Sequence, residues 1–206
     1  RHMEEAAERF GNKVDQLCGA QSRALCVSLS DLPVDDTILI ELKTCMDSWW
    51  NGRFTHPGNL GPATGLSAMC LIYFRRHLPI DEELRRHMRL GRKQCRSARQ
   101  TTAIFLAAEA TFGILANKPQ ESLQKLKEAT SVACADGYIG IPLQTVLRIA
   151  SRILPEGTAA QRYYAEWEKN LTHNICSQEP IDIGDIRDGK LPPPLATGQP
   201  KGPSPS

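Results

Sequence analysis

Residues 100–136 read QTTAIFLAAEATFGILANKPQESLQKLKEATSVACAD and contain the clearest helical pattern of the chain. Its first part is rich in alanine and apolar throughout, which is typical of a helix buried on most sides. Pro119 then opens a second helix, since proline is tolerated in a first helical turn. In that helix Leu123, Leu126 and Ala129 recur at the three-to-four spacing of one helical face. A short turn places consecutive helices antiparallel, so the stretch predicts a helical hairpin.

The same periodicity, interrupted by proline or glycine, continues on both sides of this hairpin. It predicts helices over residues 4–18, 20–32, 37–50, 62–77, 81–97, 142–154 and 159–175. The second of these ranges is ambiguous, because Leu25, Val27 and Leu29 alternate like a strand. We interpret it as a helix, since its neighbours offer no strand to pair with, and expect Gly19 to end the helix before it. The fold class is therefore predicted to be all-α, with antiparallel helical hairpins stacked on one another.

The composition divides the chain into a helical domain and a tail. The first three residues read Arg-His-Met and are interpreted as a cloning remnant. The helical domain is expected over residues 4–178. Residues 179–206 are rich in proline, glycine and serine, which supply no core, so we expect an extended or disordered tail. If this tail is ordered, it must lie against the helical body or a neighbouring chain.

Charge, apolar content and cysteine usage exclude several classes of protein. The net charge of +2 is too small to require a polyanionic partner, and no apolar run reaches the roughly 18 residues of a membrane-spanning helix. The seven cysteines form no C-x-x-C pair, which favours buried reduced thiols in the nucleus or cytoplasm. No phosphate-binding loop, zinc-protease motif or nucleophile elbow is present, so we expect no enzyme activity and no cofactor.

The densest chemical feature is a basic region near the middle of the chain. Its members are Arg75, Arg76, Arg85, Arg86, Arg89, Arg92, Lys93, Arg96 and Arg99. We interpret it as a surface for an acidic peptide, because guanidinium groups bind carboxylates through paired hydrogen bonds. Two alternatives stay open. One is a solvated helix face whose arginine stems cover apolar surface; the other is a nucleic-acid surface, which the lack of interleaved aromatic residues disfavours.

Trp49 and Trp50 are the other candidate partner-binding residues. Tryptophan is enriched at the energetic centres of interfaces, although a place in the core is the favoured reading for each ring. Among the histidines, His77 and His87 lie in the basic region, where nearby positive charge disfavours the imidazolium. Neither stands in a catalytic pattern with a cysteine, serine or carboxylate.

The hairpin at 100–136 has about the length of a tetratricopeptide (TPR) repeat. Its Ser122, Leu126 and Ala129 match the interlocking positions of such repeats. Over residues 63–194 the chain resembles the C-terminal part of the TPR subunit of the cohesin loader, the scaffold partner of Nipped-B. The resemblance rests on the order and spacing of residues 63–74, 82–86, 103–117, 121–122, 143–154, 159–171 and 192–194.

The resemblance implies a TPR-like right-handed solenoid in the nucleus that wraps an extended segment of a larger partner without enzyme activity. A weaker likeness, through Glu109-Ala110-Thr111, is to the regulatory domain of sterol-regulated transcription factors, which also binds partners. We therefore expect a protein-interaction scaffold in a chromatin or transcription complex. The alternatives are a nucleic-acid-binding module that uses residues 75–99, and an enzyme of unrecognised type.

Overall fold

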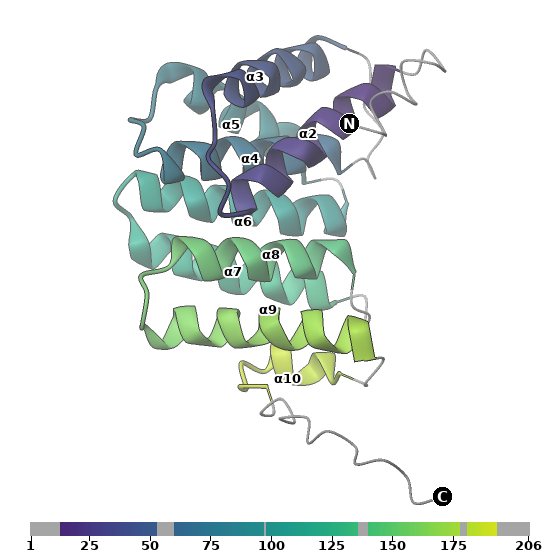
Figure 1. Ribbon diagram of the computed structural model, residues 1–206, viewed down its shortest axis with the longest axis vertical. Helices are drawn as coiled ribbons and strands as arrows, with labels where there is room; N and C mark the ends of the chain where they lie inside the picture. Colours follow the sequence, from purple (N-terminus) through teal and green to yellow (C-terminus); the bar gives the residue numbers. More distant parts are fainter. Residues whose placement is uncertain (1–12, 53–59, 97, 136–139, 178–180, 193–206) are drawn as a thin grey trace, which may run out of the picture.

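The computed structural model describes residues 13–52, 60–96, 98–135, 140–177 and 181–192. Within these ranges every regular element is a helix, which confirms the all-α fold class (Figure 1). The helices are α2 (Lys13–Leu29), α3 (Asp36–Asn51), α4 (Gly61–Arg75), α5 (Glu82–Gln94), α6 (Arg99–Leu115), α7 (Pro119–Cys134), α8 (Ile141–Ile153), α9 (Ala159–Ser177) and α10 (Ile183–Arg187).

Short-range sequence signals set most helix starts. Asp35 accepts a hydrogen bond of 3.0 Å from the amide of Ile38 and caps α3. Asp81 accepts one of 2.7 Å from the amide of Leu84 and caps α5. Proline occupies the first turn of α4, α7 and α8. Each of these starts lies within one residue of the predicted one, because aspartate caps and first-turn prolines act locally.

The helices alternate between two sets along the chain. In one set, α2, α4, α6 and α8 contact one another in succession. In the other, each of α3, α5, α7 and α9 packs against a helix of the first set that neighbours it in the chain. Figure 1 shows the helices stacked along the long axis, from α2 and α3 at one end to α10 at the other. Contacts between α2 and α8 also join the two ends of the first set.

The core lies around α4 and α6. Every residue of α4 from Gly61 to Tyr73 is buried. In α6 the run from Ala103 to Thr111 is buried as well. Among the described helices, none combines the length and apolar content needed to cross a membrane.

The first described helix corrects one prediction. Gly19 does not end a helix; α2 continues through it from Lys13 to Leu29. Glycine inside a helix costs about 1 kcal/mol relative to alanine. Leu17, Ala24 and Leu25 are buried on both sides of it, and we attribute the continuity to this packing. The strand-like alternation after residue 24 therefore belongs to a helix, as predicted. Residues 1–12, including the predicted cloning remnant, lie outside the described residues.

The beginning of the tail also differs from the prediction. Residues 181–192 are not extended throughout but contain α10 and pack against the body. Ile186 is 1% exposed. Tyr163 donates a hydrogen bond of 2.5 Å to the carbonyl of Ile186, and Trp167 Nε1 donates one of 2.8 Å to the carbonyl of Lys190. Ile181 and Ile183 pack against the core as well, and α10 contacts α7, so apolar packing and the two hydrogen bonds together hold this segment. The proline-rich residues 193–206 lie outside the described part of the chain.

Candidate binding groove

A groove of about 600 Å³ runs between α2 and α8, with the beginning of α4 at one end. On α8 it is lined by Ile141, Thr145, Arg148 and Arg152, which recur every three or four residues and so share one face. The facing wall is the side of α2 that carries Ser22. We call this feature the α2–α8 groove.

Two arginines hold the carboxyl-terminal end of the α2–α8 groove together. Arg75, at the end of α4, donates hydrogen bonds of 2.9, 3.2 and 2.8 Å to the carbonyls of Val27, Ser28 and Leu32. Arg152 of α8 pairs at 2.7 Å with Asp31, just after α2. The carboxyl termini of α2, α4 and α8 therefore meet, and the three helices run parallel. Residues from the beginnings of α4 and α8 line the other part of the groove.

The interior of the groove is polar at that other end. Thr64 of α4 and Thr145 of α8 line it, although only 9% and 7% of their surfaces are exposed. Gln144 lies beside them in the lining. Within the described residues, none of these three side chains has a hydrogen-bond partner. Their polar atoms are not among the buried side-chain atoms that lack a partner in the described residues, so they face the open space of the groove, where a polar group of a ligand could reach them.

The charges along the groove are mostly balanced. Arg148 lies 3.5 Å from the carboxylate of Glu168, which also accepts a hydrogen bond of 2.5 Å from Ser151. Arg152 is paired with Asp31 as described. Glu168 is the one acidic side chain among the described residues that line the groove, and it already has two partners. An incoming acidic group would therefore meet little uncompensated negative charge.

The predicted basic region is divided between two roles. Arg75 binds backbone carbonyls, so its role is within the fold. Arg76 lies 2.6 Å from Asp36 as an ion pair, but the geometry does not make a hydrogen bond. The remaining cations of α5 face solvent. We call the exposed set the α5 basic face, and its members are Arg85, Arg89, Arg92, Lys93 and Arg96.

The chain satisfies much of the α5 basic face itself. Arg89 pairs with Glu82 at 2.6 Å. Glu109, whose side chain is 6% exposed, lies 2.8 Å from Arg92, 3.0 Å from Arg96 and 3.7 Å from Lys125. One carboxylate thus serves three cations.

Two other cations of this face remain without an ion pair. Within the described part of the chain Arg85 and Lys93 have none. The half-exposed Arg86 binds Asp47. Arg99 is exposed and begins α6. The face therefore keeps a local excess of positive charge.

The two tryptophans have different environments, and neither is a free aromatic surface. Trp49 is 3% exposed and packs with Leu17 and Cys45. Trp50 is half-buried, and its Nε1 donates a hydrogen bond of 2.7 Å to His87 Nδ1. These contacts agree with the interpretation that both rings belong to the core.

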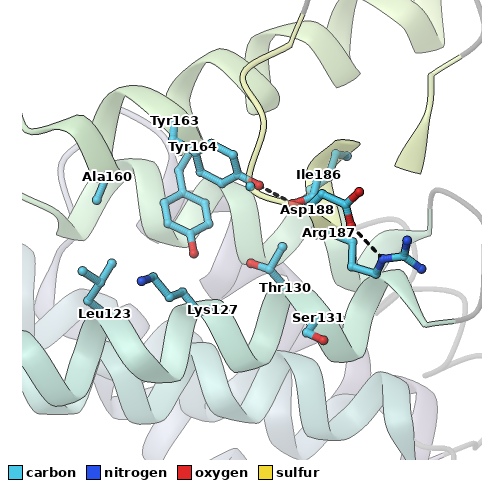
Figure 2. Close-up of a pocket in the computed structure, with 11 residues that line it drawn as sticks. Leu123, Lys127, Thr130, Ser131, Ala160, Tyr163, Tyr164, Ile186, Arg187 and Asp188 are labelled. Atoms are coloured by element: carbon cyan, nitrogen blue, oxygen red, sulfur yellow. Dashed lines mark hydrogen bonds and ion pairs between the residues drawn. The ribbon is translucent and has the colours of Figure 1, made fainter. Parts of the chain in front are cut away.

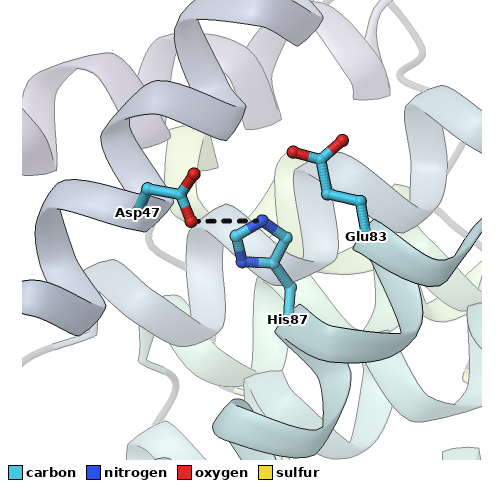
Figure 3. A group of neighbouring side chains, drawn as sticks. All are labelled: Asp47, Glu83 and His87. Carbon is cyan, nitrogen blue, oxygen red and sulfur yellow. Dashed lines mark ion pairs between the residues drawn. The ribbon is translucent and has the colours of Figure 1, made fainter.

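Asp47, Glu83 and His87 bring three groups of metal-ligand type within 4.8 Å of one another (Figure 3). The hydrogen bond from Trp50 requires an unprotonated Nδ1, so neutral His87 carries its proton on Nε2. That atom is the one that faces Asp47, at 3.8 Å. A metal there would need both ring nitrogens to be deprotonated, which neutral histidine ligands avoid. The donor set therefore does not fit a metal ion.

The same cluster instead forms a polar network. Asp47 pairs with Arg86, and Glu83 pairs with Lys43. Burial lowers the pKa of His87, and the adjacent Arg86 guanidinium lowers it further. The predicted direction for this histidine is confirmed, although burial is the larger cause.

A second cavity, of about 460 Å³, lies between α7, α9 and the segment that contains α10 (Figure 2). Tyr163 and Tyr164 form part of its wall, with ring centroids 5.0 Å apart in an edge-to-face arrangement. Part of its wall is the chain's own Ile186–Gly189. The cavity thus depends on how this segment packs, whereas the α2–α8 groove is built from three long helices.

Sequence reasoning missed the residues of the α2–α8 groove. Thr64 and Thr145 stand inside apolar helices, and nothing in their spacing distinguishes them from core threonines. One signal was present: α4 and α8 begin with proline but have no acidic residue in their first turn and no side-chain cap. Such uncapped starts are potential anion sites only when the fold brings them together.

Comparison with known proteins gives no relative: no family model, no curated protein and no solved structure matches this chain. The resemblance to the TPR subunit of the cohesin loader therefore stays a hypothesis.

Proposed function

We propose that this chain is a non-catalytic scaffold that binds an extended segment of a partner polypeptide in the α2–α8 groove. The observation that carries the proposal is the groove itself, a cavity of about 600 Å³ with polar side chains that have no partner among the described residues. A cavity of this volume is within the usual range for ligand sites.

The length of the groove suits an extended peptide. Ile141 and Arg152 are at opposite ends of the lining on α8, and the helix rises roughly 16 Å from one position to the other. An extended chain advances about 3.3 Å per residue, so about five residues would fill this length. The mixture of leucines and hydroxyls in the walls suits alternating apolar and polar side chains.

The proposal assumes a TPR-like right-handed solenoid. Its support is the succession of contacts from α2 to α4, α6 and α8, since repeat proteins stack equivalent helices in this way and bind partners on the concave surface. Three of these four helices line the groove. The nuclear setting and a role in a chromatin or transcription complex come from the resemblance alone and are part of the proposal.

Three buried thiols support a non-catalytic role. Burial raises the pKa of Cys95 to about 12 and that of Cys134 to about 11, and it raises the pKa of Cys70 as well. A nucleophilic cysteine needs the opposite shift.

The experiment is a selection from a phage-displayed library of short peptides. We expect enrichment of acidic peptides that bind wild type and lose binding to Ser22→Trp, which fills the groove from an exposed position on α2. Ser131→Trp, an exposed serine of α7 at the other cavity, is the matched control and should bind as wild type does. Equal binding to all three proteins would refute the groove.

A second candidate function is nucleic-acid binding on the α5 basic face. The observation that favours it is the excess of cations around Glu109, with Arg85 and Lys93 in addition. Such binding would weaken steeply as salt is raised. Fluorescence anisotropy with duplex and single-stranded DNA at low salt tests it, and no binding there removes it.

A further inference from the structure

The cavity between α7, α9 and the segment that contains α10 has mostly apolar walls (Figure 2). These walls consist of Leu123, Ala160, Tyr163, Tyr164 and Ile186. The volume of about 460 Å³ lies within the usual range for sites that hold small molecules. We call this feature the α7–α9 cavity. A ligand that fills it needs an apolar body.

One charged side chain in the described lining of the α7–α9 cavity has no ion pair. Of the three charged residues there, Arg187 pairs with Asp188 at 3.2 Å. Lys127 has neither an ion pair nor a hydrogen bond among the described residues. Figure 2 shows Lys127 on α7 beside Thr130, on the wall opposite α9. Since the charges of Arg187 and Asp188 balance, the lining keeps one uncompensated positive charge.

We infer that the α7–α9 cavity binds a small hydrophobic monocarboxylate, whose apolar body lies against the tyrosine rings and whose carboxylate pairs with Lys127. One negative charge balances the one uncompensated cation. A phosphate monoester would bring about −1.5 to −2 charges at neutral pH, and Arg187 is already paired. A neutral apolar ligand would remove water from the ammonium group without replacing it. The inference is independent of the α2–α8 groove.

The carboxyl-terminal segment forms part of this wall, so ligand binding and the packing of the segment are coupled. Residues 186–189 line the cavity. The same segment is held to α9 by the hydrogen bond from Tyr163 to the carbonyl of Ile186, and α10 contacts α7. A ligand that binds only the packed arrangement stabilises it by mass action. We therefore expect the bound ligand to strengthen the packing of residues 181–192 on the body.

The first test titrates the isotope-labelled full chain with three probes. Hydrocinnamate has a phenyl body and one carboxylate, hydrocinnamide has the same body without the charge, and acetate has the charge without the body. We expect saturable shifts of the amide resonances of Thr130, Tyr164 and Ile186 with hydrocinnamate and no saturation with acetate. An exposed ion pair contributes up to about fivefold in affinity, so hydrocinnamide should bind about threefold more weakly. Equal affinity of the two phenyl probes would overturn the choice of a carboxylate, and no shift with either would overturn the site.

Two substitutions locate the ligand and its charge. Ser131→Trp fills the cavity from an exposed position of α7 and should abolish hydrocinnamate binding, whereas Ser22→Trp, at the α2–α8 groove, is the matched control and should bind as wild type does. Lys127→Gln removes an exposed charge without an ion pair in the described chain, so it should fold normally. It should lower the affinity for hydrocinnamate to that for hydrocinnamide and leave hydrocinnamide unchanged. An equal loss for both probes would overturn the pairing with Lys127, and normal binding to Ser131→Trp would overturn the cavity.

The second test follows the coupling by hydrogen exchange. The amide of Lys190 donates a hydrogen bond of 2.9 Å to the carbonyl of Asp185 within the packed segment. Saturating hydrocinnamate should slow the exchange of this amide in wild type and not in Ser131→Trp. Tyr163→Phe keeps the ring but loses the hydrogen bond to Ile186, so it should speed the exchange and weaken hydrocinnamate together. If hydrocinnamate binds but leaves the exchange unchanged, the coupling is wrong. No peptide enters these measurements, so their outcome does not depend on the scaffold proposal.

Discussion

The α2–α8 groove and the α5 basic face differ in how far the chain satisfies their polar groups. On α5 most guanidinium groups have carboxylate partners from the same chain, so formal charge there overstates what a partner would meet. In the groove the side chains are mostly uncharged, but Thr64 and Thr145 lack partners within the described residues. A polar side chain that faces the groove can bind a partner without first breaking an internal ion pair, whereas the paired guanidinium groups of α5 cannot. On this ground we propose the groove as the binding surface.

The largest loss of stability is expected from Gly91→Ala, a substitution in α5, the helix of the basic face. A Cβ at Gly91 would lie 2.3 Å from Leu66 Cδ1 and 2.7 Å from Phe105 Cε2, both in fully buried side chains. Because neither neighbour has room to move, we expect a loss of about 3 kcal/mol in the free energy of unfolding. Urea denaturation measures it.

Gly113→Ala is the control, since its nearest contact is the Ser122 hydroxyl, which can rotate away. If the two variants lose the same free energy of unfolding, the close contact of Gly91 with Leu66 and Phe105 does not contribute specially to stability. At temperatures where Gly91→Ala stays folded, peptide binding in the groove should persist, because α5 does not line it.

A smaller effect, of about 2 kcal/mol, is expected from Arg75→Ala. This guanidinium donates to three carbonyls at and beyond the end of α2, so its loss should free one wall of the groove and weaken peptide binding as well as folding. Arg76→Ala is the matched control: its partner Asp36 is 78% exposed, and a solvated ion pair contributes little. Thermal unfolding and peptide affinity are measured for both. Unchanged peptide affinity in Arg75→Ala would mean that α2 does not depend on this anchor.

The sequence predicted the fold class and most helix starts, because the spacing of apolar residues and the positions of proline and aspartate act locally. It was wrong at Gly19 because packing of Leu17, Ala24 and Leu25 overrides a local break. For the start of the tail, the expectation of an extended or disordered segment was wrong, but the alternative that an ordered tail lies against the helical body describes residues 181–192, which pack through isoleucines and two hydrogen bonds from α9. Both errors concern contacts between segments that are distant in the sequence or that depend on tertiary burial.

The candidate site was less predictable than the fold. The nine cations of the basic region and the two tryptophans are plain in the sequence. The ion pairs that the cations form with Glu109, Asp47 and Asp36 depend on the tertiary arrangement. Thr64 and Thr145 are about eighty residues apart in the sequence, and only the fold brings them into the lining of one groove. Residue types alone therefore predicted a binding surface on α5, whereas the groove is defined by the arrangement of α2, α4 and α8 in space.

Low pH should destabilise the folded protein, because protonation of the buried His87 is unfavourable in the fold. Its pKa is lowered by burial and by Arg86, with Lys43 acting in the same direction and Asp47 and Glu83 opposing. Since the unfolded chain binds the proton more readily, stability is intact above the unfolded pKa of about 6.5 and falls as the pH drops below it.

The measurement is the midpoint of thermal unfolding between pH 7 and 5 for wild type and His87→Gln, which keeps an acceptor for Trp50. We expect the decline in wild type and a flatter profile in the variant. Parallel profiles would assign the acid sensitivity to other groups.

The smallest effect on folding is expected from the double reversal Arg85→Glu and Lys93→Glu. Both side chains are exposed and have no ion pair among the described residues, so their replacement breaks no ion pair there and should change the free energy of unfolding by less than about 0.5 kcal/mol. Peptide affinity should likewise stay at the wild-type value if the groove is the binding surface, while any DNA binding should be lost. A loss of peptide binding with unchanged stability would reverse the comparison, because it would make the uncompensated charge of α5, and not the hydroxyls of the groove, the feature that a partner recognises.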